Sequence, residues 1–217
     1  MDKRIYGLYA IIDTTYTEVT EAARAASLLI AGGARIIQLR AKGLSAAQTL
    51  EAALAIRRAT SDGDALFIVN DRIDVALIAG ADGVHLGQDD IPAKDALSLL
   101  KGLIIGISTH NEQEARQAEA DGATYISFGP IFPTMTKKDA DTPKGLDRLK
   151  DIKGSVRLPV VAIGGITEGL AVDVLSAGAD SIAMISELLT ASSIRDRTES
   201  VAKRIKTYYN GYMNSTP

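Results

Sequence analysis

The sequence predicts a (β/α)8 (TIM) barrel formed by a single domain of residues 1–217. Short apolar runs alternate eight times with longer segments in which apolar residues recur at helical spacing. The short runs are apolar throughout, which is typical of parallel strands that are buried on both faces. The 217 residues give about 27 per unit, which suits a compact barrel, whereas doubly wound open sheets usually contain fewer units.

Each predicted strand is an apolar run that ends in polar or small residues, and each predicted helix has an apolar face. The predicted strands are 8–12, 35–40, 66–70, 83–86, 103–107, 124–128, 159–163 and 180–184. The predicted helices are 19–30, 45–60, 72–79, 92–100, 111–121, 145–152, 168–177 and 187–208. Ser45 is a suitable N-cap for the second helix, and residues 210–217 are expected to fray.

An internal signature supports the repeat. A short glycine-containing segment closes a predicted helix and opens the next strand at 31–34 (AGGA), 79–82 (AGAD), 121–124 (DGAT) and 177–180 (AGAD). Glycine recurs there because it adopts the left-handed conformation after a helix end without strain.

Composition limits the functional classes. Hydrophobic residues make up 46% of the chain and aromatic residues only 5%, and the net charge is −3. Without a basic tract or an apolar run of roughly 18 residues, we expect neither nucleic acid nor membrane as a partner. The chain has no cysteine, and no long apolar core follows Met1, so we expect a cytoplasmic protein without a signal peptide. The oligomeric state stays open, and a homo-oligomer is compatible with the sequence.

Polar residues follow the second predicted strand with the spacing of one strand face. Gln38, Arg40 and Lys42 share a face, whereas Leu39 and Ala41 point away. Arg40 suits bidentate binding of a phosphate and Lys42 acts as a point charge, so the set fits a polyphosphate. The alternative is a basic pair on the surface at a strand end.

Carboxylates and amides follow the next two strands, at Asn70-Asp71 and at Gln88-Asp89-Asp90. Carboxylates together with phosphate oxygens are typical ligands of Mg²⁺. Taken singly, however, Asp71 and Asp90 also fit the N-caps of the helices that follow them.

Further polar and small residues lie at the ends of the later strands. Ser108 either donates to a substrate or caps the fifth helix, and His85 fits a hydrogen-bonded core residue. The longest loop, 129–143, is either a functional lid or a solvated basic loop. Gly164-Gly165 and Ile185-Ser186 end strands seven and eight, where (β/α)8 barrels commonly bind phosphate. The residues alone therefore predict two phosphate sites with a divalent cation between them, but no reaction.

The chain resembles the thiamine phosphate synthase family over nearly its whole length. The matching segments are QLRAK (38–42), NDRIDVA (70–76), GADGVHLGQDD (80–90), GISTHN (106–111), GPIFPTMTKKDA (129–140), AIGGIT (162–167) and MIS (184–186). That family joins a pyrimidine methyl diphosphate to a hydroxyethylthiazole phosphate and releases pyrophosphate. The resemblance implies a transferase of thiamine biosynthesis that uses Mg²⁺ and these two phosphorylated substrates.

The resemblance also implies roles for individual residues. The pyrimidine diphosphate is expected on Gln38, Arg40, Lys42, Asn70, Ser108 and Lys137, and Mg²⁺ on Asp71 and Asp90. The thiazole phosphate is expected on Thr134, Thr136 and Gly165, with Ile185 and Ser186 at the boundary between the two substrates. The residues expected to act in catalysis are Arg40, Ser108 and Lys137.

In the implied reaction, pyrophosphate leaves a methylene carbon, the aminopyrimidine ring stabilises the resulting carbocation, and the thiazole nitrogen attacks it. No strong general base is needed, so catalysis rests on stabilising the leaving group and excluding water. Two departures from the family pattern stand out. Ala41 stands where the family usually has glutamate. Early in the seventh helix the family often has an asparagine, whereas this chain has Thr167-Glu168-Gly169-Leu170, in which Gly169 costs roughly 0.5–1 kcal/mol relative to alanine.

Two other functions remain as alternatives. A thiazole tautomerase-like paralogue shares the barrel and the thiazole phosphate site but typically lacks the Thr-x-Thr-Lys segment and the paired aspartates. A non-catalytic barrel that binds a phosphorylated ligand would not need Asp71, Asp90 and Lys137 together. All of these residues are present in this chain.

Overall fold

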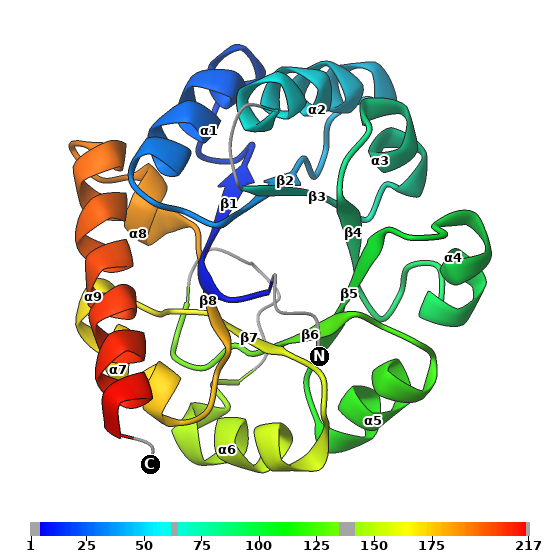
Figure 1. Cartoon of the computed structure of the whole chain (residues 1–217). Helices are drawn as coiled ribbons and strands as arrows, with labels where there is room; N and C mark the ends of the chain where they lie inside the picture. The colour runs from blue at the N-terminus through cyan, green and yellow to red at the C-terminus, as the bar shows by residue number, and fades with distance from the viewer. Residues whose placement is uncertain (1–4, 62–64, 135–141, 216–217) are drawn as a thin grey trace.

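Eight parallel strands close into a barrel in the order β1 to β8 in the computed structural model, which describes residues 5–61, 65–134 and 142–215 (Figure 1). The strands are β1 (Gly7–Asp13), β2 (Ile36–Arg40), β3 (Leu66–Asn70), β4 (Gly83–Leu86), β5 (Ile104–Thr109), β6 (Tyr125–Phe128), β7 (Val160–Ile163) and β8 (Ser181–Met184). Each lies within two residues of its predicted bounds. The predicted (β/α)8 barrel is therefore confirmed.

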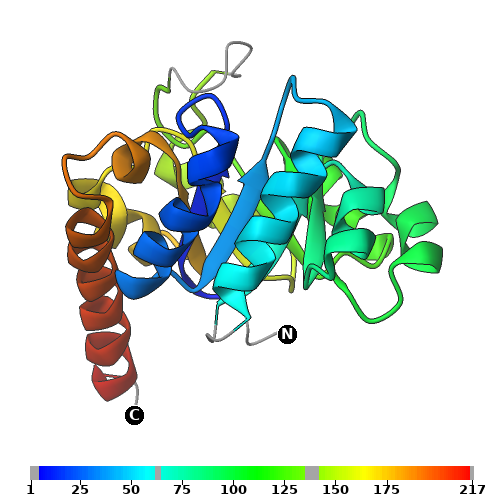
Figure 2. The same ribbon diagram turned by 90° about the horizontal axis from the view of Figure 1, so that it is seen from above.

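The helices form a ring around the outside of the barrel (Figures 1 and 2). They are α1 (Ala22–Ala31), α2 (Ala46–Thr60), α3 (Ile73–Ala79), α4 (Ala93–Leu99), α5 (Glu112–Ala120), α6 (Gly145–Ser155), α7 (Ala171–Ser176), α8 (Ser186–Leu189) and α9 (Ile194–Ser215). Short 3-10 helices, η1 (Val19–Glu21) and η2 (Glu168–Leu170), precede α1 and α7. Among the described residues, no helix has the length and apolarity that crossing a bilayer requires.

Alternation along the strands divides the core into two layers. Residues such as Leu8, Ile37 and Val84 point outward and pack against the helices in one large cluster. Their neighbours point into the barrel and form a smaller cluster, which comprises Ile5, Tyr9, Ile11, Ile36, Ile68, Ile104, Tyr125, Val161 and Ala183. A packed interior of this kind leaves space for a ligand only at an end of the barrel.

The capping predictions are confirmed. The Ser45 hydroxyl accepts a hydrogen bond from the Gln48 backbone N–H at 3.3 Å, and the Gln48 side chain accepts from the Ser45 N–H at 3.1 Å, which completes a capping box. Each repeated segment has one glycine with a positive φ, at residues 33, 80, 122 and 178. They turn the chain from a helix into the next strand, as the repeat indicates.

The last residue of three of these segments supports the neighbouring strand. The Asp82 carboxylate accepts from the Phe67 N–H at 2.7 Å, and the Asp180 carboxylate accepts from the Val160 N–H at 2.8 Å. Each carboxylate also binds a cation from a preceding helix, Arg57 at 3.0 Å and Lys153 at 2.5 Å respectively. In the third segment the Thr124 hydroxyl accepts from the Ile105 N–H at 3.0 Å. The last residue of these segments therefore accepts a hydrogen bond from a backbone N–H near the amino end of β3, β5 or β7.

The prediction for the C-terminal segment was wrong in two respects. The single helix expected over 187–208 is divided into α8 and α9, with residues 190–193 between them. Moreover, α9 continues to Ser215, so residues 210–215 are helical instead of frayed. The last turns of α9 project beyond the other helices in Figure 2. The α9 helix packs against α1, α7 and β1, and this packing holds the part of α9 that lies beside the barrel.

We predict that Asp180→Ala lowers the free energy of unfolding by about 1–3 kcal/mol, because it leaves the Val160 N–H without its acceptor and Lys153 without its partner. Chemical denaturation measures this change. Asp151→Ala, which removes a carboxylate that is 62% exposed in a surface pair with Arg148, is the control and should change stability by less than about 0.5 kcal/mol. Equal effects of the two substitutions would contradict the role of Asp180.

Candidate active site

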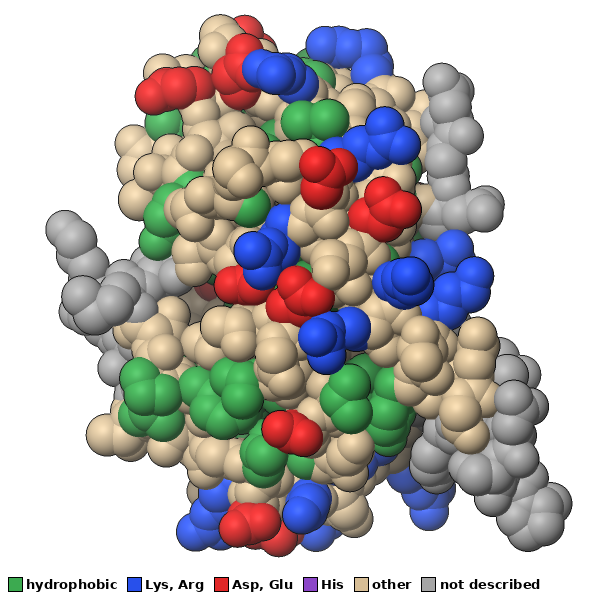
Figure 3. Space-filling view, turned by 90° about the vertical axis from the view of Figure 1, so that its left-hand side faces the viewer, with side chains coloured by type: hydrophobic (Ala, Val, Ile, Leu, Met, Phe, Trp, Pro, Cys, Tyr) green, Lys and Arg blue, Asp and Glu red, His purple; other side chains and the backbone are tan. Residues whose placement is uncertain are grey.

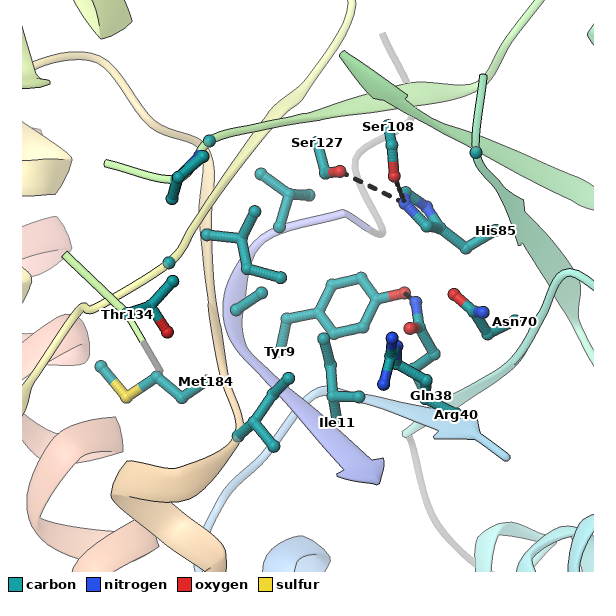
Figure 4. Close-up of a pocket in the computed structure, with 18 of the residues that line it drawn as sticks. Tyr9, Ile11, Gln38, Arg40, Asn70, His85, Ser108, Ser127, Thr134 and Met184 are labelled. Atoms are coloured by element: carbon teal, nitrogen blue, oxygen red, sulfur yellow. Dashed lines mark hydrogen bonds between the residues drawn. The ribbon is translucent and has the colours of Figure 1, made fainter. Parts of the chain in front are cut away.

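A cavity of about 860 Å³ opens at the carboxyl ends of the strands, and every strand or the loop after it contributes to its lining (Figure 4). Its volume lies in the upper part of the range for small-molecule sites. It brings together these predicted residues: Gln38, Arg40, Lys42, Asn70, Asp71, Asp90, Ser108, Thr134, Gly165, Ile185 and Ser186. Thr136 and Lys137 lie outside the described residues. The roles predicted for all of these residues remain predictions.

The cations at the end of β2 are held by carboxylates. An Arg40 guanidinium nitrogen lies 2.6 Å from a carboxylate oxygen of Asp13, which is fully buried at the end of β1. The Lys42 ammonium lies 2.7 Å from Asp71. Leu39 belongs to the outer core, and Ala41 packs against that core, as the alternation predicts. Arg40 is therefore held by a buried carboxylate, whereas Lys42, whose side chain is 58% exposed, forms a more accessible pair with Asp71.

Asp71 and Asp90 are not helix caps. The N-cap residues of α3 and α4 are Arg72 and Pro92, and neither helix has a side-chain cap. Asp71 has a φ of 62°, an unusual conformation for a residue with a side chain. The Asp90 carboxylate instead accepts from the Gly87 N–H at 2.7 Å, which closes the loop after β4.

The two carboxylates lie against each other. Burial raises the pKa of Asp90 above its usual range, and the adjacent Asp71 raises it further. The described residues contain no group of three or more acidic, histidine or cysteine side chains that could hold a metal ion. A divalent cation between Asp71 and Asp90 would therefore complete its shell with oxygens of a ligand or water, which is how Mg²⁺ usually binds phosphorylated substrates. The residues present fit that ion.

Ser108 and His85 form a polar contact on the inner wall of the cavity (Figure 4). The Ser108 hydroxyl lies 2.9 Å from Nε2 of His85, and Nδ1 of His85 lies 2.9 Å from the Tyr125 hydroxyl. Asn111 caps α5, so the alternative that Ser108 is a cap was wrong. The interpretation of His85 as a hydrogen-bonded core residue is confirmed, since it is 7% exposed.

Glycines shape the opposite side of the cavity. Gly164 and Gly165 have φ values of 100° and 63°. A Cβ on Gly164 would lie 2.5 Å from Cβ of Pro130, and one on Gly165 would lie 2.8 Å from the carbonyl oxygen of Phe132. The first part of the loop after β6 thus packs directly on these glycines, and the Phe132 N–H donates to the Gly164 carbonyl at 3.0 Å. Larger residues cannot occupy these positions without moving the loop.

An ionic cluster holds the segments next to these glycines. Arg197 of α9 lies 3.2 Å from Glu168 and 3.0 Å from Glu187, and Arg204 lies 3.0 Å from Glu168. A hydrogen bond from Ser200, together with the two arginines, lowers the pKa of Glu168. Acidic and basic side chains alternate on this face of the molecule (Figure 3). The cluster ties η2 and α8 to α9 and so fixes the rim of the cavity.

Sequence reasoning missed Tyr9 and Tyr125, which line the cavity, and Asp13, which holds Arg40. Asp13 could have been found, because period two places it on the inward face of β1 at the strand end. Gly106 carried a signal for Tyr125, because a Cβ on Gly106 would collide with the Tyr125 ring. Glycine inside a strand commonly marks such a close approach.

The side chains of the cavity can act on a bound ligand through their charges. One side of the cavity combines two tethered cations with two adjacent carboxylates, which suits a polyphosphate and a divalent cation. The other side presents backbone and small residues in loops after β7 and β8, which suit a second phosphate. Among the residues that the structure describes, the hydrogen-bond partners of the His85 ring are hydroxyl groups and not a carboxylate of the kind that orients a general base.

Comparisons with known proteins agree with this geometry. The family model described as thiamine monophosphate synthase matches residues 8–188. The thiamine-phosphate synthase of Methanoculleus marisnigri is 46% identical over 200 residues, covering 88% of this chain and 95% of the relative, and that of Chloroflexus aurantiacus is 45% identical over 187 residues, covering 86% and 87%. The structure of thiamine phosphate pyrophosphorylase from Pyrococcus furiosus superposes with a TM-score of 0.86 at 40% identity, covering 94% of this chain and 96% of that one.

We predict that the His85 imidazole remains neutral at pH values well below the usual pKa of histidine. Burial lowers the pKa of its imidazole from 6.5 to about 4, against the opposing effect of Asp71. Between these pH values the unfolded chain binds a proton that the native protein does not. This contribution to stability is therefore fully present above about pH 6.5 and is lost as the pH falls towards 4, by about 1–2 kcal/mol at pH 5.

A pH titration of the histidine resonances by NMR, together with chemical denaturation at pH 7 and 5, measures both effects. The His85→Gln variant is the control for the denaturation experiment, since it lacks this part of the pH dependence. A His85 resonance that titrates near pH 6.5 would contradict the prediction.

Proposed function

The chain belongs to the thiamine monophosphate synthase family, and from this membership we propose how its residues carry out the reaction. It is a thiamine-phosphate synthase, a transferase of thiamine biosynthesis that acts on small phosphorylated substrates. The substrates are a pyrimidine methyl diphosphate and a hydroxyethylthiazole phosphate, and the products are thiamine phosphate and pyrophosphate. The observation that carries the assignment of roles is the division of the cavity into a charged side and a glycine-lined side.

We propose that the charged side binds the diphosphate of the pyrimidine substrate. Arg40 suits two phosphate oxygens and Lys42 a third, while the amides of Gln38 and Asn70 face the same cavity. The buried Asp13 holds the Arg40 guanidinium in place at 2.6 Å. Because the guanidinium is preorganised, less conformational entropy is lost when the diphosphate binds.

Asp71 and Asp90 are proposed as the protein ligands of Mg²⁺. Support comes from the proximity of the two carboxylates: burial raises the pKa of Asp90, and the adjacent Asp71 raises it further, as expected for a carboxylate pair without a cation between its members. When bound there, Mg²⁺ neutralises charge on the diphosphate as it becomes a leaving group. Asp71 also contacts Lys42 at 2.7 Å, so the same carboxylate would orient both a cationic side chain and the metal.

The glycine-lined side is proposed to bind the thiazole phosphate. Thr134 and Gly165 line it, and Ile185 and Ser186 lie at the end of β8, where the two substrates would meet. The close packing of Gly165 on Phe132 brings backbone from two loops together, as phosphate binding without a basic residue requires. Thr136 and Lys137, which lie outside the described residues, retain their predicted roles from the sequence.

These residues would promote the reaction by position and charge. Arg40, with Lys137, stabilises the departing pyrophosphate, and Ser108 holds the pyrimidine ring whose methylene carbon becomes cationic. Attack by the thiazole nitrogen then forms the new carbon–nitrogen bond and requires no proton transfer from a base. The walls of the cavity shield the cation from water, which would otherwise capture it.

Two wider expectations are proposals as well. We propose that the whole chain works as one catalytic domain, because β1 pairs with β8 and the barrel is complete only when both ends are present. The predicted cytoplasmic location and the compatibility with a homo-oligomer remain predictions from the sequence.

The decisive experiment measures pyrophosphate release by the purified protein with the pyrimidine diphosphate, the thiazole phosphate and Mg²⁺, omitting each in turn. Release that requires all three, together with formation of thiamine phosphate, is the expected result. A folded protein that binds the thiazole phosphate without releasing pyrophosphate would instead indicate the tautomerase-like or the non-catalytic barrel.

We predict that Asp90→Asn raises the Mg²⁺ concentration needed for half-maximal turnover by about tenfold or more, which corresponds to about 1.4 kcal/mol or more. Asparagine keeps an oxygen for the Gly87 N–H but removes the negative charge that the cation needs. The matched control is Asp95→Asn at an exposed carboxylate of α4 that does not line the cavity, and its Mg²⁺ dependence should stay within about twofold of wild type. Equal Mg²⁺ dependence of Asp90→Asn and wild type would remove Asp90 from the metal site.

A further inference from the structure

A chain of hydrogen-bonded side chains crosses the inner wall of the cavity from β2 to β5. The Gln38 amide nitrogen lies 2.6 Å from the Tyr9 hydroxyl, which lies 2.8 Å from the Tyr125 hydroxyl. Tyr125 in turn lies 2.9 Å from Nδ1 of His85, and Nε2 of His85 lies 2.9 Å from the Ser108 hydroxyl. Both ends of the chain, Gln38 and Ser108, line the cavity (Figure 4).

The interior members of this chain are buried and uncharged. Tyr9 and Tyr125 are at most 1% exposed and His85 is 7% exposed. Burial raises the pKa of both tyrosines, so both are neutral at physiological pH. Hydroxyl groups lie against both ring nitrogens of His85, and a histidine is neutral above its ordinary pKa of about 6.5. A buried hydroxyl hydrogen without an acceptor is costly, so each hydroxyl in the chain must donate to a partner.

This requirement gives the chain a direction. The Gln38 nitrogen can only donate, so the Tyr9 oxygen accepts from it and the Tyr9 hydrogen goes to Tyr125. Tyr125 then donates to Nδ1 of His85, the one remaining partner of its hydroxyl among the described residues. A neutral imidazole that accepts at Nδ1 carries its hydrogen on Nε2. Nε2 therefore donates to Ser108, whose own hydrogen is left to point elsewhere.

We propose that Gln38, acting through Tyr9, Tyr125 and His85, orients the Ser108 hydroxyl as a hydrogen-bond donor towards the cavity. In this arrangement the Gln38 amide oxygen is the acceptor at one end and the Ser108 hydroxyl is the donor at the other. An aminopyrimidine has the complementary pattern, because its amino group donates and its ring nitrogens accept. The inference rests on the proposed function only for the identity of this ring, and Tyr9, Tyr125 and His85 are positioning residues.

Neighbouring residues support this geometry. The Ser127 hydroxyl lies 3.2 Å from Nε2 of His85, so a hydrogen on Nε2 is shared between two serine oxygens. The Ser108 carbonyl accepts from the Gln88 side chain at 2.5 Å, which fixes the backbone of Ser108. The absence of a side chain at Gly106 makes room for the Tyr125 ring in the middle of the chain. If every hydrogen bond in this series ran in the opposite direction, Gln38 would present a donor to the cavity and Ser108 an acceptor.

The first test is ¹⁵N NMR of the histidine rings in the ligand-free wild-type protein at pH 8. The His110→Gln variant assigns the signals, because the protein contains only two histidines. We expect His85 to be neutral with its hydrogen on Nε2. A hydrogen on Nδ1 would overturn the proposal. This result does not depend on substrates, so it stands or falls separately from the proposed function.

The second test reverses the chain. In the Gln38→Glu variant the new carboxylate can only accept, so Tyr9 donates to it, Tyr125 donates to Tyr9, and His85 must carry its hydrogen on Nδ1. We expect the ¹⁵N spectrum to show this change of tautomer at a residue that Gln38 does not touch. A folded Gln38→Glu protein with an unchanged His85 tautomer would overturn the proposal.

The third test interrupts the chain with Tyr125→Phe. We expect a mixture of His85 tautomers and at least a tenfold lower kcat/KM for the pyrimidine diphosphate, whereas the KM for the thiazole phosphate stays within twofold. The matched control is Tyr209→Phe, which removes a hydroxyl that donates to the Asp180 carbonyl at 2.7 Å outside the cavity. It should leave the His85 tautomer and kcat/KM within twofold of wild type. Loss of activity in Tyr125→Phe without a change of tautomer would overturn the proposal.

Discussion

Alternation along eight parallel strands is the constraint on which the rest of this protein depends. Because successive side chains point to opposite faces, every strand sends half of its residues into a closed interior. Apolar side chains such as Ile36, Ile68 and Ile104 fill the interior beneath the cavity. Polar residues that reach water or a ligand inside the barrel therefore lie where the strands approach their carboxyl ends. The cavity is the consequence of this arrangement.

The charged side of the cavity shows how the fold keeps cations available without leaving them loose. Arg40 and Lys42 each contact a carboxylate, but these carboxylates come from different strands, β1 for Asp13 and the end of β3 for Asp71. Asp13 is fully buried, so its charge requires Arg40 and in turn holds it. Asp71 is more accessible and lies against Asp90. The Asp13–Arg40 pair is therefore suited to holding the Arg40 guanidinium in one orientation. The Asp71–Lys42 pair is suited to exchanging partners when a diphosphate and a divalent cation bind.

The inner wall carries polar groups in a place where they are costly. Among the described residues, no buried side-chain nitrogen or oxygen lacks a hydrogen-bond partner, so the cost of burying Tyr9, Tyr125 and His85 is offset by their mutual contacts. A fully paired network has little freedom to rearrange, because moving one hydrogen requires moving the others. Such a wall can present a fixed pattern of donors and acceptors to a ring that has few polar atoms of its own.

The sequence by itself determined the eight strand–helix units, the inward face of β2 and the cluster of polar residues at the strand ends, because these follow from local periodicity and the order of the chain. It could not determine which inward residues touch. Tyr9 and Tyr125 are 116 positions apart and meet only because the barrel closes. Asp13 meets Arg40 because the register pairs these two residues. The contacts of α9 with α1 and β1 likewise join segments that lie far apart in the sequence. Local patterns fix which face a residue occupies, whereas register and closure, which involve the whole chain, decide its partners.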